Sequence, residues 1–310
     1  MKRVIVLGAL LAAGSLSVAL SAYRQAAGAQ PKPMVVEVEK LKDNLFVLKG
    51  GGGNTGVFVT TAGVVVVDTK NPGWGKPILD KIRELTDKPV TLIINTHTHG
   101  DHVSGNVEFP ATVDVVTHEN TKTNMAKMLA PSGFPPSTAT QTIFEANGGR
   151  GLPKRTFTDK MTIGSGNDQI DLLYFGRGHT NGDAWVVFPT LKVMHAGDIF
   201  SGKNVPLLDA INGGSGVDMP ETLSKAADFA TTNIDTIITG HSTQMTVADL
   251  REYSAFNRDF LNAVLEAKKA GITVDDLAAS WKVPEKYTGY ATPQAQRLKS
   301  NIEVVLAELK

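Results

Sequence analysis

Residues 91–102 read Thr-Leu-Ile-Ile-Asn-Thr-His-Thr-His-Gly-Asp-His, an apolar strand that runs directly into a dense cluster of polar side chains. In an extended loop alternate residues point the same way, so His97 and His99 can hold one ion together. Asp101 and His102 begin the following segment and can face a second ion. A surface loop with only capping roles would rarely hold three histidines and an aspartate so close together. We therefore interpret this stretch as a metal-binding motif.

Three further polar residues follow predicted strands in the same way. Each is directly preceded by a glycine: His179 after the strand 170–175, Asp198 after 192–195 and His241 after 236–239. Strands of one core can deliver such residues to a common edge, and glycine lets the backbone turn closely there. Imidazole and carboxylate ligands without thiolate suit Zn²⁺, iron or Mn²⁺. Seven candidate ligands are too many for one tetrahedral zinc and enough for two ions that share a carboxylate.

The composition excludes several classes of protein. The 310 residues carry 31 Lys and Arg against 31 Asp and Glu, so the formal net charge is zero and no broad basic surface is available for nucleic acid. The absence of cysteine excludes disulfides, thiolate metal sites and a thiol nucleophile. We expect a small-molecule substrate and no nucleic-acid partner, and nothing in the sequence indicates an oligomeric state.

The first residues have the pattern of a secretory signal peptide. Lys2 and Arg3 precede an apolar run over residues 4–22, and small residues at 27–29 offer a cleavage site. An uncleaved membrane anchor is the alternative, because the run is nearly long enough to span a bilayer, but glycines and serines dilute it. We expect residues 1–29 to be removed, leaving a periplasmic or secreted protein without a stable membrane anchor.

Two strand-rich halves flank an irregular middle. Short apolar runs predict strands before residue 117 and again after residue 170, whereas residues 131–169 are rich in Gly, Pro, Ser and Thr. After His241 the pattern becomes helical, with predicted helices at 247–269, 274–281 and 293–309. We expect a sandwich domain over residues 30–246 and a helical extension over residues 247–310 that packs on the same domain.

The set His97-x-His99-x-Asp101-His102, His179, Asp198 and His241 resembles the full ligand set of the metallo-β-lactamase superfamily. The resemblance covers about residues 35–245 and includes the run Val64–Val67 with Asp68, which is similar to an early strand-plus-aspartate motif of that family. It implies an α/β fold, the four-layer αββα metallo-β-lactamase sandwich, with the metals at one edge. It also implies that one metal is held by His97, His99 and His179, the other by Asp101, His102 and His241, and that Asp198 bridges them.

The resemblance extends to more than one branch of this superfamily. Residues 178–189, the export signal and the glycines at 50–53 look like the zinc β-lactamases. Asp198 stands where the largest group of those enzymes has cysteine, and together with His102 it resembles the glyoxalase II and lactonase branches. The resemblance implies two Zn²⁺ ions per chain that hydrolyse a small carbonyl compound: a β-lactam-like amide as first choice, or a lactone or thioester. Asp101 would orient the attacking hydroxide as a catalytic residue.

Two other functions stay open. A persulfide dioxygenase of the same fold would bind one iron ion through positions like His97, His179 and Asp198, and these ligand types serve both metals. A zinc-binding protein without catalytic activity is the third class. The metal content of the purified protein separates the first two, since two zinc ions favour hydrolysis and one iron ion favours the dioxygenase.

Three residues outside the ligand set are candidate substrate contacts. Lys203 and Asn212 follow Asp198 in a loop where β-lactamases place groups that hold the substrate, and Trp74 could form an apolar flap. A solvated loop position for Lys203 and Asn212, and a packing role for Trp74, are the alternatives.

The remaining polar residues of interest have predicted structural roles. His118 and His195 lie outside the ligand pattern, so we expect both to be structural. Asp68 ends a strand that faces the histidine cluster, and we expect it to orient a metal-binding histidine without binding the metal itself.

Overall fold

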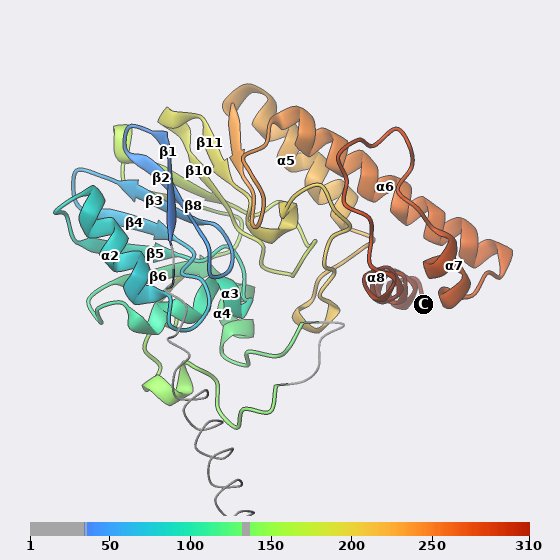
Figure 1. The fold of residues 1–310 in the computed structure, drawn as a ribbon, viewed down its shortest axis with the longest axis horizontal. Helices are drawn as coiled ribbons and strands as arrows, with labels where there is room; N and C mark the ends of the chain where they lie inside the picture. Colours follow the sequence, from blue (N-terminus) through green and yellow to red (C-terminus); the bar gives the residue numbers. More distant parts are fainter. Residues whose placement is uncertain (1–33, 35, 132–136) are drawn as a thin grey trace, which may run out of the picture. The chain divides into compact units, whose positions relative to one another are not determined.

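Two β-sheets form the centre of the structure, a computed structural model that describes Met34, residues 36–131 and residues 137–310 (Figure 1). The signal peptide predicted at residues 1–29 lies outside the described residues. Residues 35–310 cluster as one unit. Within the described part of the chain, no helix has the length and apolar character that a membrane crossing requires.

One sheet has seven strands in the order β1-β2-β3-β4-β5-β6-β7, and the other has five in the order β12-β11-β10-β9-β8. The strands of the first sheet are β1 (Glu37–Lys42), β2 (Leu45–Lys49), β3 (Thr55–Val59), β4 (Val64–Val67), β5 (Val90–Ile94), β6 (Asp114–His118) and β7 (Arg155–Phe157). The strands of the second are β8 (Lys160–Ile163), β9 (Ile170–Leu173), β10 (Trp185–Phe188), β11 (Val193–His195) and β12 (Thr236–Ile238). The α-helices of the described residues are α2 (Gly75–Leu85), α3 (Gly100–Val103), α4 (Glu119–Met125), α5 (Met219–Asn233), α6 (Val247–Ala270), α7 (Val274–Ser280) and α8 (Ala295–Glu308).

Strand β4 explains how the sequence builds the layers. Its four valines are all buried, as a strand covered on both faces requires. Val65 and Val67 belong to the core between the two sheets. Val64 and Val66 belong to the core on the outer face, which includes Ile78 of α2. Because side chains alternate along a strand, this one run supplies two separate layers of packing.

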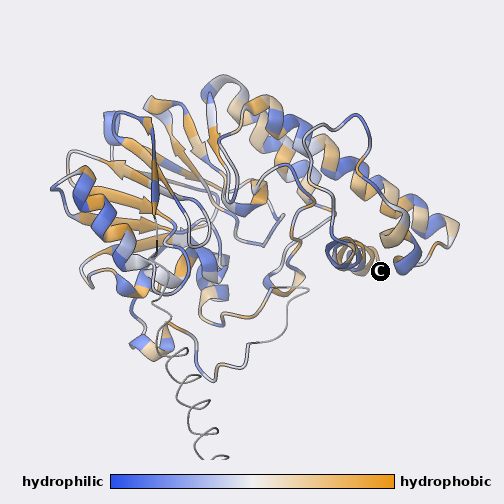
Figure 2. Ribbon diagram, viewed as in Figure 1, coloured by the Kyte–Doolittle hydropathy of each residue, from blue (hydrophilic) through white to orange (hydrophobic). Residues whose placement is uncertain are grey.

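The outer face of the second sheet is covered by the C-terminal helices. Trp185 of β10 and Met194 of β11 share one core with side chains of α5, α6, α7 and α8. The figures show α2 beside β4 on one side, α5 and α6 beyond β11 on the other, and apolar strands between them (Figures 1 and 2). The predicted αββα sandwich is confirmed, and the predicted helices beyond residue 246 correspond to α6, α7 and α8.

The sequence prediction did not include helices α3 and α5 or strands β7 and β8. Helix α5 buries mostly small residues, such as Ala226, Ala227 and Ala230, so its apolar periodicity is weak. Strands β7 and β8 lie within the irregular segment 131–169 and are only three and four residues long. Such short segments carry too little alternation to be distinguished from a loop.

The topology directs several strand ends to one place. In the first sheet β4 runs parallel to β5, and in the second sheet β11 runs parallel to β12. Asp68 follows β4, the histidine motif follows β5, Asp198 follows β11 and His241 follows β12. Since the carboxyl ends of parallel strands meet at one edge, the fold gathers these residues there.

Helix α8 is tied to the loop that precedes α5 by buried polar contacts. The amide of the fully buried Asn301 donates to the Pro206 carbonyl at 2.8 Å and accepts from the Leu208 amide at 3.4 Å. Glu308 accepts from the Ser215 hydroxyl at 2.7 Å. These bonds join the C-terminal extension to residues 206–215.

We predict that Asn301→Ala lowers the free energy of unfolding by about 1–3 kcal/mol, because it leaves two buried backbone groups without their partner. Urea denaturation followed by circular dichroism measures the change. Glu303→Ala, at an exposed position of the same helix, is the matched control and should stay within about 0.5 kcal/mol of the wild type. An Asn301→Ala variant as stable as this control would contradict the anchoring role.

Candidate metal centre

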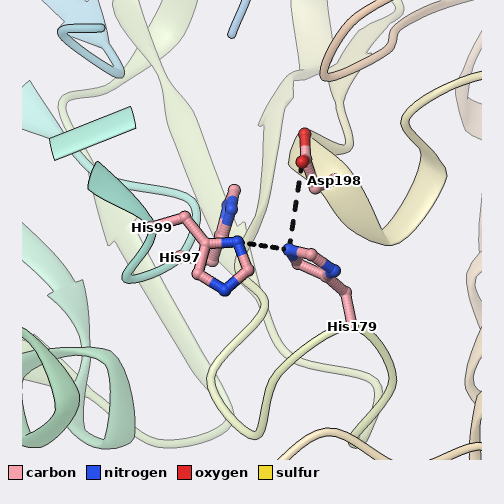
Figure 3. Close-up of side chains that lie close together, drawn as sticks. All are labelled: His97, His99, His179 and Asp198. Atoms are coloured by element: carbon pink, nitrogen blue, oxygen red, sulfur yellow. Dashed lines mark hydrogen bonds and ion pairs between the residues drawn. The ribbon is translucent and has the colours of Figure 1, made fainter. Parts of the chain in front are cut away.

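All seven predicted metal ligands lie together at the edge where these strands end. Their donor atoms form two groups, and within each group the atoms lie within 4.8 Å of one another. A third such group joins Asp68 to His97 and His102. The first group, drawn in Figure 3, contains His97, His99, His179 and Asp198, and the second contains Asp101, His102 and His241. Asp198 also reaches the second group, since its Oδ2 lies 3.2 Å from His241 Nε2 and its Oδ1 lies 3.2 Å from His102 Nε2.

The rings of His99 and His179 are each fixed by a hydrogen bond to a residue outside the donor group. His99 Nε2 donates to Asp209 Oδ2 at 2.8 Å, and His179 Nδ1 donates to the Leu207 carbonyl at 2.7 Å. A neutral imidazole has one donor and one acceptor nitrogen, so the remaining nitrogens of both rings are acceptors. These two nitrogens, His99 Nδ1 and His179 Nε2, face each other at 3.0 Å (Figure 3). Because facing lone pairs repel, the arrangement requires a proton or a metal cation between them.

His97 has the same need for a cation. Its Nδ1 donates to Thr96 Oγ1 at 2.9 Å, and its buried Nε2 has no hydrogen-bond partner among the described residues. A buried polar atom left unpaired costs about 1–3 kcal/mol, a cost that metal coordination removes. A set of imidazole and carboxylate donors suits Zn²⁺, iron or Mn²⁺. The residues at this site therefore fit a metal ion.

Asp68 has the orienting role that the sequence predicts. Its fully buried carboxylate accepts from Thr96 twice, at Oδ1 from the amide at 2.8 Å and at Oδ2 from the hydroxyl at 2.7 Å. Oδ2 also accepts from His102 Nδ1 at 2.7 Å, which leaves His102 Nε2 for a metal. Asp68 adopts a left-handed backbone conformation with φ of 63°, which is strained for a residue other than glycine. One carboxylate thus positions His102 directly and His97 through Thr96.

Asp101 and Asp198 are ionised at neutral pH. Burial raises the pKa of Asp101, but His241 and His102 outweigh this effect and lower the pKa to about 2. Burial acts in the same direction on Asp198, and the same two histidines hold its pKa well below the usual range. Burial, with His102 and His179 nearby, lowers the pKa of His97 well below that of a free histidine. Asp101, Asp198 and His97 are therefore in the protonation states that metal ligands need. Burial lowers the pKa of His241 and of His102, but Asp101 and Asp198 raise that of His241 to about 9, and Asp198 and Asp68 raise that of His102 well above its usual value. These two histidines must each lose a proton when a metal binds.

The glycine loop at residues 50–53 packs directly against the second group. A Cβ atom on Gly53 would lie 2.1 Å from the His102 ring, so a side chain has no room there. The ammonium of the fully buried Lys70 donates to the Leu48 and Gly53 carbonyls at 2.9 and 2.6 Å. Burial lowers the pKa of Lys70 to about 7. Lys70 thus holds this loop in place.

A cavity of about 640 Å³ opens beside the two groups. Five of the seven ligands line it: His99, Asp101, His179, Asp198 and His241. Residues 291–294 and Arg297, from the C-terminal extension, also line it. The volume is in the range of small-molecule sites.

The three predicted substrate contacts do not line this cavity. Lys203 Nζ forms ion pairs of 2.9 Å with two acidic residues of α6. Asn212 is buried and its side-chain amide donates to Asp209 at 2.5 Å. Trp74 packs against the core under α2. Direct contact of these residues with a substrate stays a prediction, and in this structure each supports a loop near the site.

The two other histidines have structural contacts, as the sequence predicts. His195 Nε2 donates to the Asn54 carbonyl at 3.1 Å, and its Nδ1 accepts from the Gly197 amide at 3.1 Å. His118 Nδ1 accepts from the Asn120 amide at the start of α4, and its ring stacks on Tyr174.

Sequence reasoning missed Asp209, although this residue fixes a candidate metal ligand. It is fully buried and lies 110 residues after His99 in an irregular loop. No local pattern marks it, because its role exists only once that loop is folded against the histidine motif.

Comparisons with known proteins agree with this geometry. The family model of the metallo-beta-lactamase superfamily matches residues 48–241. The metallo-beta-lactamase type 2 of Elizabethkingia meningoseptica is 30% identical over 176 residues, which make up 53% of this chain and 62% of that relative. The match thus spans less than two thirds of the relative's length.

Solved structures share the fold. The metallo-beta-lactamase from Pontibacter korlensis has a TM-score of 0.57 at 20% identity, over 72% of this chain and 99% of its own. The stereoselective inverting sec-alkylsulfatase Pisa1 from Pseudomonas sp. has a TM-score of 0.67 at 15% identity, over 86% of this chain and 50% of its own.

We predict that Asp209→Asn weakens metal binding about 10- to 100-fold, because the ring of His99 loses the carboxylate that fixes it. Competition with a chelating dye measures the affinity. Asp80→Asn, on the exposed side of α2, is the control and should bind metal like the wild type. Equal metal affinity in Asp209→Asn and the control would show that Asp209 does not position the ligand.

Proposed function

Because the chain belongs to the metallo-beta-lactamase superfamily, we propose that it is an exported dinuclear zinc hydrolase that acts on a small carbonyl compound. The observation that carries this proposal is the shared carboxylate. Asp198 lies within 4 Å of His179 in the first donor group and of His102 and His241 in the second. A carboxylate between two donor groups is the arrangement that two neighbouring ions need.

We propose that His97, His99 and His179 hold one zinc ion and that Asp101, His102 and His241 hold the other, with Asp198 between them. Two zinc ions bound here would supply Lewis acidity and would lower the pKa of a water between them toward about 7. The chain itself contributes pre-oriented nitrogen lone pairs, because Thr96, Asp209, the Leu207 carbonyl and Asp68 fix the opposite side of four rings. Little reorganisation is then needed when the ions bind.

Asp101 is the proposed catalytic residue. Its carboxylate lines the cavity and lies 3.2 Å from His241 Nε2, so it belongs to the second donor group and faces the substrate space at once. Because its pKa is held at about 2, it accepts hydrogen bonds throughout the neutral range. From this position it can orient the attacking water through a hydrogen bond.

The proposed substrate is a small molecule with an activated carbonyl. The likeness to β-lactamases favours a β-lactam-like amide, and lactones and thioesters are the other members of the class. The chain provides no nucleophilic cysteine, so attack by a zinc-activated water is the route that its residues support.

A second candidate function is hydrolysis of an alkyl sulfate ester. The likeness to the sec-alkylsulfatase covers 86% of the chain. Since only 246 of the 310 residues precede α6, that likeness extends into the C-terminal helices. The likeness to the Pontibacter metallo-beta-lactamase covers 72% of the chain, so the sulfatase matches more of the chain than that protein does.

We also propose that residues 1–29 direct export and are then cleaved, on the basis of the sequence pattern alone. The mature protein would begin at residue 30 and act in the periplasm or outside the cell. N-terminal sequencing of the protein recovered from a periplasmic extract tests this step.

We predict two zinc ions per chain in protein purified without chelators, measured by elemental analysis. His97→Ala and His241→Ala should each retain about one ion, and the double variant should retain none, because each residue belongs to a different donor group. His118→Asn, a histidine outside the site, is the control and should retain both ions. One iron ion per wild-type chain would instead favour the mononuclear persulfide dioxygenase.

We predict that the zinc-loaded protein opens the ring of at least one β-lactam and also hydrolyses at least one lactone or thioester. A panel of a penicillin, a cephalosporin, a carbapenem, a lactone, a thioester and a secondary alkyl sulfate measures this, with Asp101→Asn as the catalytically impaired control. Turnover of the alkyl sulfate alone would favour the second candidate. No turnover of any compound would contradict the hydrolase proposal.

A further inference from the structure

The C-terminal extension forms part of the wall of the cavity that holds the metal ligands. Ala291, Thr292, Pro293, Gln294 and Arg297 line the same 640 Å³ space as His179 and Asp198. The family model ends at residue 241, so this wall lies outside the segment that the family model matches. A wall of this kind can distinguish one substrate from another without taking part in the metal chemistry.

The wall is held rigidly against the rest of the site. The Ala291 amide donates to the Lys203 carbonyl at 3.0 Å, and the ammonium of Lys203 pairs with Asp249 and Glu252 of α6. One turn beyond Arg297 on the same face of α8, Asn301 donates to the Pro206 carbonyl. Residues at this wall therefore have fixed positions relative to the donor groups.

Arg297 differs from the rest of the wall by its charge. Among the described residues that line the cavity, it is the one Lys or Arg side chain. It is half-buried, and it interacts electrostatically with the carboxylate of Asp198. Burial lowers the pKa of Arg297, but a guanidinium keeps its charge at neutral pH.

The position of Arg297 within α8 is unfavourable for the helix alone. It lies in the first turn, where the positive end of the helix dipole repels a cation, and no acidic residue occupies that turn. An anion in the cavity would meet both the guanidinium and the positive end of the helix dipole.

We propose that Arg297 is a specificity-determining residue that binds an anionic oxygen group, a carboxylate or a sulfate, on the substrate. The planar fork of a guanidinium donates two parallel hydrogen bonds to such a group. This proposal rests on the proposed function, because it assumes that the scissile group of the same substrate lies at the metal ligands. It narrows the substrate class to anionic compounds.

Calorimetric titration of the zinc-loaded protein with succinate, hexyl sulfate and neutral succinamide tests the proposal without catalysis. We expect both anions to bind more tightly than succinamide. Arg297→Gln should weaken the better anion about 10- to 100-fold, and Arg297→Lys should restore part of that loss, because it keeps the charge without the fork. Lys299→Gln, an exposed lysine of the same helix that pairs with Asp275, is the matched control and should bind like the wild type.

The titration also separates the two anions. Tighter binding of succinate indicates that Arg297 recognises a carboxylate, and tighter binding of hexyl sulfate indicates that it recognises a sulfate. Either conclusion requires that Arg297→Gln abolishes the preference. Anion binding that is equal in the wild type and Arg297→Gln would overturn the proposal. So would the absence of any anion binding by the wild type.

Hydrolysis of 4-nitrophenyl hydrogen succinate and of its neutral counterpart, 4-nitrophenyl butyrate, gives the second readout. Arg297→Gln should raise KM for the anionic ester about 10- to 100-fold and leave kcat, and both constants for the neutral ester, within about two-fold. A KM that is unchanged for the anionic ester would overturn the proposal. Arg297-dependent anion binding in a protein that hydrolyses nothing would instead contradict the hydrolase proposal and leave only the anion site at Arg297 standing.

Discussion

The buried carboxylate of Asp68 is the interaction on which the rest of the site depends. It accepts three hydrogen bonds, from the amide and hydroxyl of Thr96 and from the ring of His102. Through them it joins the end of β4 to the histidine motif after β5 and fixes two rings of the donor groups at once. A fully buried charge survives only when its neighbours satisfy it, so these residues must fold together. The strained backbone of Asp68 is maintained by the same bonds.

The histidine cluster contains contacts that lower the stability of the metal-free fold and favour the binding of a metal. The facing nitrogens of His99 and His179 and the unpartnered Nε2 of His97 would be unfavourable in a core built for stability alone. Each ring is nevertheless held by a second bond on its other side, so the cluster cannot relax away from this arrangement. A bound cation removes the repulsion and satisfies the lone pairs, and its binding energy adds to the stability of the fold.

The C-terminal helices have two roles that depend on each other. Their apolar faces complete the core on the outer side of the second sheet. Their polar residues hold the loop that carries Leu207 and Asp209, and both of these fix rings of the first donor group. Asn301 contacts Pro206 and Leu208 on either side of Leu207, so the packing of α8 reaches a metal ligand through one loop. The same helix lines the cavity with Arg297.

The sequence by itself determined the sandwich and all seven residues of the two donor groups. These features are local, because apolar runs such as Val64–Val67 mark buried strands and polar residues directly after strand ends mark the site. The sequence could not predict which residues hydrogen-bond to these side chains, since Asp209 acquires its role through a contact with His99, 110 residues earlier in the chain. The cavity position of Arg297 and the ion pairs of Lys203 also arise only when α6 and α8 pack on the sheet. The ends of the strands can be predicted from the short-range pattern of apolar and polar residues. The contacts that support the donor groups depend on which distant loops the folded chain brings together.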